Sequence, residues 1–252
     1  LHRILWDAAR KRLGAERIHS GHRLQALIQN AQDVHLQFLR PNGEQHSVQT
    51  SIAIGCDGIN SSVRRLFHSA EPLAFTGINT WRGVTRHKPI LTGKSYMRIG
   101  SIKTGKMVIY PIVDNIDAQG NQLINLMVEI EGDSRDMNDW NTGGKIEDFM
   151  PIFSDWKFDW LDVPALIRNA EQVLQYPMVD KDPIPQWTFG RVTLMGDAAH
   201  PMYPRGSNGS AQALIDARTL ATELAHMADP LLALQSYEAK RREVTSRIVE
   251  TN

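Results

Sequence analysis

RVTLMGDAAHPMYPRGSNG, residues 191–209, is the stretch that decides the predicted fold. Its first five residues form a compact, mainly apolar run, which is typical of a buried strand. Gly196 and Asp197 follow as a turn, and prolines and glycines then lead into a helical pattern. A carboxylate at the end of a strand can accept hydrogen bonds from sugar hydroxyls, as an acidic residue does in nucleotide-binding folds. Asp197 is therefore the first candidate binding residue.

The glycines after this turn add a second binding feature. Gly206 and Gly209 would let the backbone approach a flat ligand closely. The helix that follows would direct its N–H groups and the positive end of its dipole at that ligand, which suits a ring that becomes anionic. The alternative is that Asp197 only caps the turn and the glycines only relieve backbone strain. The binding residues that we expect here, besides Asp197, are Gly196, Pro204, Gly206, Ser207, Asn208 and Gly209.

A second segment, GCDGINSSVR at residues 55–64, follows a short apolar run and leads into a helical turn predicted at 61–67. Asp57, Gly58 and Arg64 are its candidate binding residues. Alternatively, Asp57 and Gly58 form an ordinary turn and Arg64 is a solvated helix charge. Asp57 lies 140 positions before Asp197, which leaves room for an inserted domain. We expect Asp57 and Asp197 to face a common cleft.

Together and in this order, the two segments resemble the DG and GD motifs of the class A FAD-dependent aromatic monooxygenases, the para-hydroxybenzoate hydroxylase family. The stretches TWRGVT at 80–85 and LQYPMVDKDP at 174–183 resemble members that act in phenazine biosynthesis. The resemblance extends over nearly the whole chain. It implies an α/β (mixed α+β) fold, in which an antiparallel-sheet substrate domain is inserted into a partial FAD-binding Rossmann-like domain.

The resemblance also implies a function and a cofactor. FAD would be reduced by NADH or NADPH, and a small aromatic or heteroaromatic substrate would be hydroxylated with dioxygen through a flavin hydroperoxide. A dehydrogenase, reductase or halogenase on the same scaffold is the alternative, because the motifs bind flavin without dictating the oxygen chemistry. No GxGxxG follows a strand in the sequence, so we expect the unit that holds the ADP half of FAD to be missing and the chain alone to be inactive.

The sequence predicts two interleaved domains. Residues 1–70 and 185–252 would form the incomplete FAD-binding domain, and residues 71–184 would form the substrate-binding domain. Trp81, Arg82 and Tyr203 are candidate substrate-binding residues, although Trp81 and Arg82 could equally be a packed cross-strand pair with a stacked guanidinium. We expect strands at 16–20, 23–29, 34–40, 45–54, 79–85, 106–110, 122–131, 172–179 and 191–195, and helices at 1–13, 145–153, 164–169, 206–227 and after 230.

Composition limits the partners. Lys+Arg and Asp+Glu both total 28, so no net charge favours nucleic acid or an anionic membrane. No apolar run reaches the roughly 18 residues of a membrane span. The single cysteine, Cys56, is expected to be a small buried residue, and no metal-binding spacing is seen. We therefore expect a cytoplasmic enzyme, which could form homo-oligomers.

Overall fold

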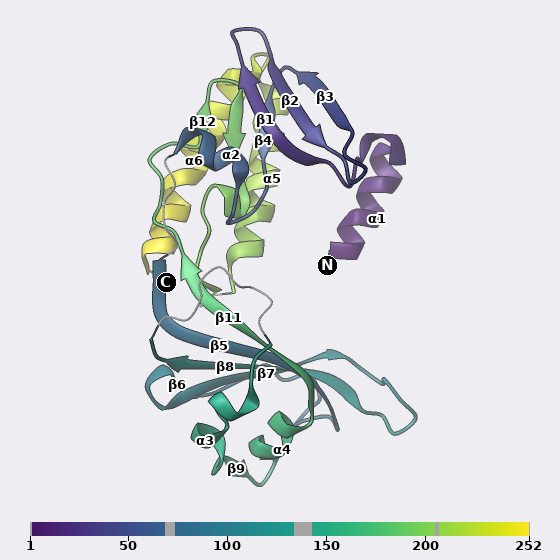
Figure 1. Cartoon of the computed structure of the whole chain (residues 1–252), viewed down its shortest axis with the longest axis vertical. Coiled ribbons are helices and arrows are strands. Elements are labelled where there is room, and N and C mark those ends of the chain that lie inside the picture. The colour runs from purple at the N-terminus through teal and green to yellow at the C-terminus, as the bar shows by residue number, and fades with distance from the viewer. Residues whose placement is uncertain (1, 69–73, 134–142, 205–206, 252) are drawn as a thin grey trace. The chain divides into compact units, whose positions relative to one another are not determined.

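The structure, a computed structural model, describes residues 2–68, 74–133, 143–204 and 207–251. Helices and strands both contribute, as expected for the mixed α/β class. The chain divides into two compact units, one formed by Leu1–Glu71 with Asp182–Asn252 and the other by Pro72–Lys181 (Figure 1). The assignment of the first unit to the cofactor and of the second to the substrate stays a prediction.

The first unit is built around a three-stranded sheet in the order β12-β13-β4. β13 (Val192–Leu194) is fully buried and pairs in parallel with β4 (Ala53–Gly55), while β12 (Thr188–Phe189) pairs with it in antiparallel fashion. The helices α5 (Gly209–His226) and α6 (Pro230–Thr251) contribute Leu220, Leu234 and Tyr237 to the same core. Because β4 and β13 run in the same direction, the segments that follow them emerge at the same edge of the sheet.

A separate antiparallel sheet in this unit comprises β1 (Arg23–Gln29), β2 (Val34–Leu39) and β3 (Gln45–Thr50). β2 and β3, which correspond to the strands expected at 34–40 and 45–54, form a hairpin with Gly43 at φ 84° in its turn. α2 (Ser62–Phe67) confirms the helical turn expected at 61–67.

The strand expected at 16–20 is wrong. After α1 (His2–Leu13), residues Ala15–Arg17 form a 3₁₀ turn instead. Gly14 ends α1 at φ 89°, and the N–H of Ile18 then donates to the carbonyl of Ala15 at 3.2 Å. This segment therefore forms its hydrogen bonds locally rather than with a neighbouring strand.

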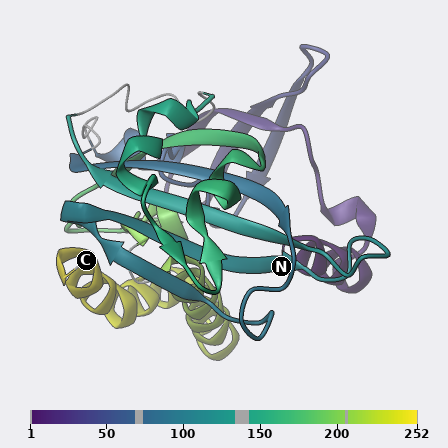
Figure 2. The same cartoon turned by 90° about the horizontal axis from the view of Figure 1, so that it is seen from below.

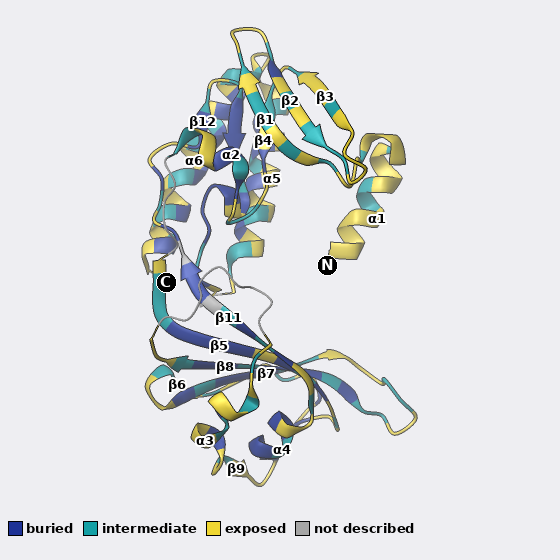
Figure 3. Cartoon of the chain, viewed as in Figure 1, coloured by how far each residue is buried: buried dark blue, intermediate teal, exposed yellow. Residues whose placement is uncertain are grey.

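The second unit is a five-stranded antiparallel sheet in the order β11-β5-β8-β7-β6. β5 is buried along its middle (Figure 3). The short helices α3 (Met150–Phe153) and α4 (Val163–Arg168) lie over one face of the sheet (Figure 2). Their apolar side chains join the core. The strands are β5 (Ala74–His87), β6 (Met97–Ser101), β7 (Gly105–Val113), β8 (Gln122–Glu131) and β11 (Ala170–Asp180), and a small hairpin of β9 (Lys157–Phe158) and β10 (Leu161–Asp162) lies between the helices in the chain.

Two expectations for this unit need correction. The helix expected at 145–153 is split into a 3₁₀ turn, Ile146–Asp148, and α3. Phe149 has a non-helical φ of −129° with ψ −18°, and Pro151, which lacks an N–H, is accommodated in the first turn of α3. β6 was not predicted at all.

Among the helices of the described residues, none combines the length and apolarity that a membrane span requires.

Candidate cofactor site

A cavity of about 540 Å³ lies in the first unit, at the edge where β4 and β13 end. Both sequence segments contribute residues to its wall. Its volume is within the range of small-molecule and cofactor sites. The lining residues are Cys56 and Gly58 after β4, Met195, Gly196 and Asp197 after β13, and Met202, Pro204, Ser207, Asn208, Gly209, Ser210 and Ala213 around the start of α5.

Asp197 lies in the 3₁₀ turn Gly196–Ala198 that follows β13. The turn is anchored to β4 because the N–H of Met195 donates to the carbonyl of Gly55 at 2.9 Å. Asp197 is exposed, and no side chain or N–H of another described residue donates a hydrogen bond to its carboxylate. The alternative in which this carboxylate caps the turn therefore has no support in the geometry. Instead, both carboxylate oxygens are available to a ligand in the cavity.

The start of α5 forms the opposite part of the wall. A Cβ built on Gly209 would lie 3.9 Å from Oδ1 of Asp197 and 3.6 Å from Cγ of Met202, so the helix begins very close to the turn. Ser207, a non-glycine residue at φ 52°, and Asn208 precede it and also line the cavity. The first N–H groups of a helix have no partner inside it, and together with the helix dipole they favour negative charge. Gly206 lies outside the described residues.

These features fit the ribityl and ring half of a flavin. An acceptor carboxylate suits the ribityl hydroxyls, and a helix N-terminus suits a ring that gains negative charge on reduction. Gly58, at φ 78°, adds an open part of the wall, since a Cβ built there would meet no atom within 4 Å. Position 58 therefore favours glycine because of its positive φ and not because a side chain would lack space.

Asp57 has a local role in the structure. Its Oδ2 accepts hydrogen bonds from the N–H groups of Ser62 at 2.6 Å and Val63 at 3.2 Å. The hydroxyl of Ser61 donates to its Oδ1. The carboxylate thus satisfies the first N–H groups of α2. Asp57 lies next to two residues of this cavity, but it lines a different cavity of about 660 Å³. The expectation that Asp57 and Asp197 face one cleft is therefore wrong for Asp57 itself.

Arg64 connects the two segments. The residue is 2% exposed, and Nη1 of its guanidinium donates to the carbonyl oxygens of Ala199 at 3.1 Å and Ala198 at 3.4 Å. Nη2 donates to the carbonyl of Asp182 at 3.3 Å. The alternative of a solvated helix charge is wrong, because the long side chain crosses to the backbone of the other segment. A direct contact between Arg64 and the cofactor stays a prediction.

Cys56 was expected to be buried, but it is exposed and lines the cavity. Desolvation by the surrounding protein atoms nevertheless raises the pKa of its thiol to about 11, with the charges of Asp57 and Asp216 adding to the effect. The thiol is therefore protonated near neutral pH and is a poor nucleophile.

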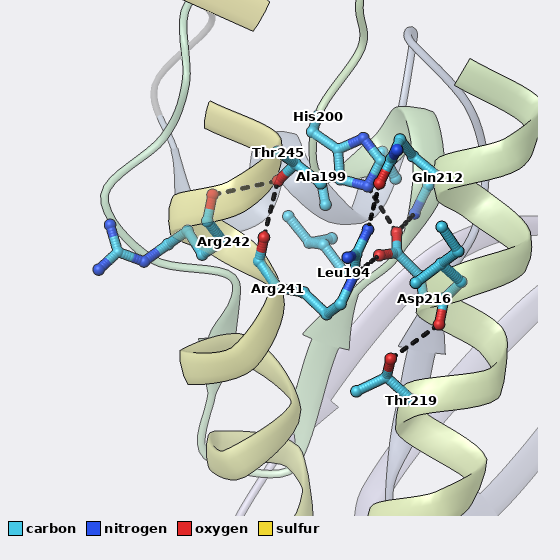
Figure 4. Close-up of polar contacts among 12 residues, drawn as sticks. Leu194, Ala199, His200, Gln212, Asp216, Thr219, Arg241, Arg242 and Thr245 are labelled. Carbon is cyan, nitrogen blue, oxygen red and sulfur yellow. Dashed lines mark hydrogen bonds and ion pairs between the residues drawn. The ribbon is translucent and has the colours of Figure 1, made fainter. Parts of the chain in front are cut away.

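Sequence reasoning missed a buried polar network directly behind the Gly196–Asp197 turn (Figure 4). Asp216, on α5, is 0% exposed. Its Oδ2 accepts hydrogen bonds from the N–H of Gly196 at 3.1 Å and from Nε2 of His200 at 2.5 Å. Its Oδ1 accepts one from Nε of Arg241, on α6, at 2.7 Å.

One sequence signal could have revealed this network. Gln212, Asp216 and Glu223 are polar residues that share the buried face of α5 with Leu220. Polar residues on the apolar face of a helix need hydrogen-bond partners from neighbouring elements. The identity of those partners could not be read from the spacing.

In the second unit, alternation along β5 separates the two candidate substrate residues. Trp81 is 3% exposed and packs in the core, with its ring centroid 5.4 Å from that of Phe149. Arg82 points away from that core and is exposed, and its Nε donates to Oδ1 of Asn125 at 2.6 Å. Tyr203, in the first unit, is 3% exposed and does not line the cavity.

The sheet face that carries Arg82 also carries an ion pair with little solvent exposure. Nζ of Lys106 lies 2.5 Å from Oε2 of Glu129, and their side chains are 13% and 3% exposed. The two residues are directly opposite each other on β7 and β8.

In the part of the chain that the structure describes, no group of three or more His, Cys, Asp or Glu could hold a metal ion.

Two curated relatives are similar to this chain. Phenazine 1,6-dicarboxylic acid hydroxylase PhzS from Lysobacter antibioticus is 39% identical over 258 residues, which cover 100% of this chain and 63% of that protein. 6-Hydroxynicotinate 3-monooxygenase from Bordetella bronchiseptica is 30% identical over 207 residues, which cover 79% of this chain and 51% of that protein. The chain thus spans less than two thirds of the length of either relative.

A solved structure and a protein family also match this chain. The crystal structure of Klebsiella pneumoniae HpxO complexed with FAD and uric acid matches with a TM-score of 0.76 at 19% identity, covering 98% of this chain and 60% of HpxO. At that identity the match shows the fold alone. The family described as FAD binding domain matches residues 1–97 and 172–252, which is most of the chain and includes both cavity-lining segments. This chain therefore belongs to the FAD-binding domain family.

Proposed function

We propose that the full-length polypeptide that carries this chain is an FAD-dependent monooxygenase. It uses NADH or NADPH and dioxygen to hydroxylate a small aromatic or heteroaromatic ring. The observation that carries the proposal is that residues after β4, residues after β13 and the start of α5 line one and the same cavity. The names of the two relatives, a hydroxylase and a monooxygenase of aromatic heterocycles, support the reaction type.

Within this proposal, the chain's own residues bind and orient the cofactor. The carboxylate of Asp197 accepts hydrogen bonds from ribityl hydroxyls. The N–H groups around Asn208, Gly209 and Ser210 at the start of α5 favour negative charge on the ring. Gly58 leaves room beside the ring. Bound FAD supplies hydride acceptance and the activation of dioxygen, which no protein side chain can provide.

We assign substrate recognition to the sheet face of the second unit that carries Arg82. Nη2 of Arg82 is 3.5 Å from the hydroxyl of Tyr110, and Nε is held by Asn125, so the guanidinium is oriented without being neutralised by either partner. An oriented guanidinium can bind a carboxylate or phenolate. The preferred substrates in this proposal are aromatic acids and phenols. Trp81 supports this face from the core side of β5.

The test is the reaction of the purified full-length polypeptide under ¹⁸O₂ with FAD, NADH or NADPH and a panel of aromatic acids. The expected result is oxidation of the nicotinamide together with one ¹⁸O atom in the product, measured by mass spectrometry. A product that is halogenated, dehydrogenated or free of ¹⁸O would overturn the proposal in favour of another flavoprotein activity.

A further inference from the structure

We propose that Asp216 is a positioning residue for FAD, which acts by holding the Gly196–Asp197 turn in the shape that presents the Asp197 carboxylate to the cavity. This inference rests on the proposed function, because it takes FAD as the ligand of the cavity. Asp216 itself does not line the cavity. It acts from behind the turn, through Gly196.

The turn needs an acceptor from outside itself. Gly196 is buried and begins the 3₁₀ turn, so its N–H has no acceptor within that turn. Its φ of 61° lies in the left-handed region, and a Cβ built there would lie 3.4 Å from Cβ of Ala213. Oδ2 of Asp216 accepts the N–H at 3.1 Å. Without that acceptor a buried N–H would be left unpaired, and the turn would have to rearrange to reach water.

A carboxylate is the group that suits this position. Three donors converge on it, from Gly196, His200 and Arg241, and a carboxylate has only acceptors to offer them. His200 must therefore carry a proton on Nε2. An asparagine at position 216 would turn an NH₂ group toward at least one of these donors. Even this nearly isosteric change is expected to disturb the turn.

Arg241 ties the same carboxylate to α6 and stabilises its charge. Arg241 is 6% exposed, and its Nη2 donates to Oε1 of Gln212 at 2.6 Å (Figure 4). Burial by itself raises the pKa of Asp216, but the hydrogen bonds from His200, Arg241 and Gly196 outweigh burial and hold the pKa below its ordinary value. Asp216 is thus ionised at neutral pH, as its role requires.

Glu223 is a matched control on the same helix. It is 5% exposed and also joins α5 to α6, because Oε2 accepts from the hydroxyl of Ser236 at 2.6 Å and Oε1 from Nζ of Lys240 at 2.5 Å. It makes no hydrogen bond to the turn. Glu223→Gln therefore perturbs a buried acidic link between the two helices while it leaves the support of the turn intact.

The first measurement needs no cofactor. Hydrogen–deuterium exchange of the full-length apo protein reports on peptides that cover residues 195–200. We expect Asp216→Asn to speed exchange of the Gly196 amide by about tenfold or more, because its hydrogen bond is weakened. Glu223→Gln is expected to leave this exchange at the wild-type rate. Equal protection in the wild type and Asp216→Asn would overturn the inference.

The second measurement is FAD binding, followed by flavin absorbance and fluorescence. Asp216→Asn is expected to raise the dissociation constant about tenfold, which corresponds to about 1.4 kcal/mol. In a double-mutant cycle with Asp197→Ala, the two effects are expected to be less than additive, because Asp216 acts through Asp197. Strictly additive effects would mean that Asp216 only stabilises the fold, and the inference would be wrong.

Asp216→Asn could unfold the protein, since it leaves Arg241 buried without its counter-charge. The variant Asp216→Leu/Arg241→Met removes both charges and is expected to fold, while it still removes the acceptor of the Gly196 N–H. It should bind FAD at least tenfold more weakly, by roughly the same margin as Asp216→Asn. Wild-type affinity in this variant would overturn the inference. If the wild type itself binds no FAD, the proposed function fails instead, and the exchange experiment still tests the support of the turn.

Discussion

Nη1 of Arg64 lies 3.1 Å from the carbonyl oxygen of Ala199, 135 positions later in the chain. This hydrogen bond links the helix after β4 to the turn after β13. The two segments therefore support each other directly, in addition to the pairing of their strands. Mutations in one segment are expected to affect the other.

Arg64→Met should lower the free energy of unfolding by about 3 kcal/mol, because buried carbonyls lose a charged donor. Urea denaturation measures this. Arg65→Met is the control: Arg65 is on the same helix but exposed, where it contacts the carbonyl of Asn60 and the hydroxyl of Ser62, and we expect a change of less than about 0.5 kcal/mol. If Arg64→Met weakened FAD binding at unchanged stability, Arg64 would contact the cofactor directly.

Asp57→Ala should destabilise the protein by about 1 kcal/mol, because the first N–H groups of α2 lose their acceptor. Asp57→Asn keeps one acceptor oxygen and should lower the free energy of unfolding by less than Asp57→Ala does. Thermal and urea unfolding of both variants measure the difference. A large loss of FAD affinity with no loss of stability would instead place Asp57 in direct contact with the cofactor.

Asp197→Ala should raise the dissociation constant for FAD roughly 10- to 150-fold, the equivalent of one charge-assisted hydrogen bond of about 1.5–3 kcal/mol. The stability of the apo protein should be unchanged, since no described residue donates to this carboxylate. Isothermal titration of the apo protein with FAD and its thermal unfolding are the two measurements. An unchanged dissociation constant would leave Asp197 as a turn residue only.

The stability of the protein should depend on pH through Asp216. Its pKa is depressed in the folded state, so its contribution is fully present above the unfolded pKa and is lost as pH falls through the folded value. His200, Arg241 and the N–H of Gly196 lower its pKa, and its own charge in turn raises the pKa values of Cys56 and Tyr237. Urea denaturation from pH 6 downward gives the free energy of unfolding of the wild type and of Asp216→Leu/Arg241→Met. We expect the difference between these two free energies to become smaller below about pH 4. A difference that does not change with pH would contradict this assignment.

Trp81 and Arg82 should respond in opposite ways to truncation. Trp81→Ala removes a large core side chain and should cost about 3–5 kcal/mol of stability. Arg82→Ala removes an exposed side chain and should cost less than about 1 kcal/mol, while it raises KM for an anionic aromatic substrate. Denaturation and steady-state kinetics separate the two. A stability loss for Arg82→Ala without any change in KM would remove it from the substrate site.

Part of this molecule could be predicted from local sequence patterns. The turn at Gly196, the helical turn at 62–67 and the long strands β5 and β8 are all set by backbone sterics and by the period of apolar residues. The same local chemistry predicted Asp197 and the start of α5 as neighbours, and both line one cavity. The split helix at 145–153 was missed because the effect of Pro151 and the conformation of Phe149 interrupt an otherwise helical pattern.

The sequence by itself therefore determined which residues could form the turns, the strands and the cavity wall. Only the tertiary structure decided which buried polar groups meet, as in the contacts of Arg64 with Ala199 and of Asp216 with Gly196. It also decided that Trp81 rather than Arg82 faces the core. The physical reason is that a strand's alternation defines two faces without saying which one is covered. Likewise, a buried charge requires partners, but long-range packing chooses them.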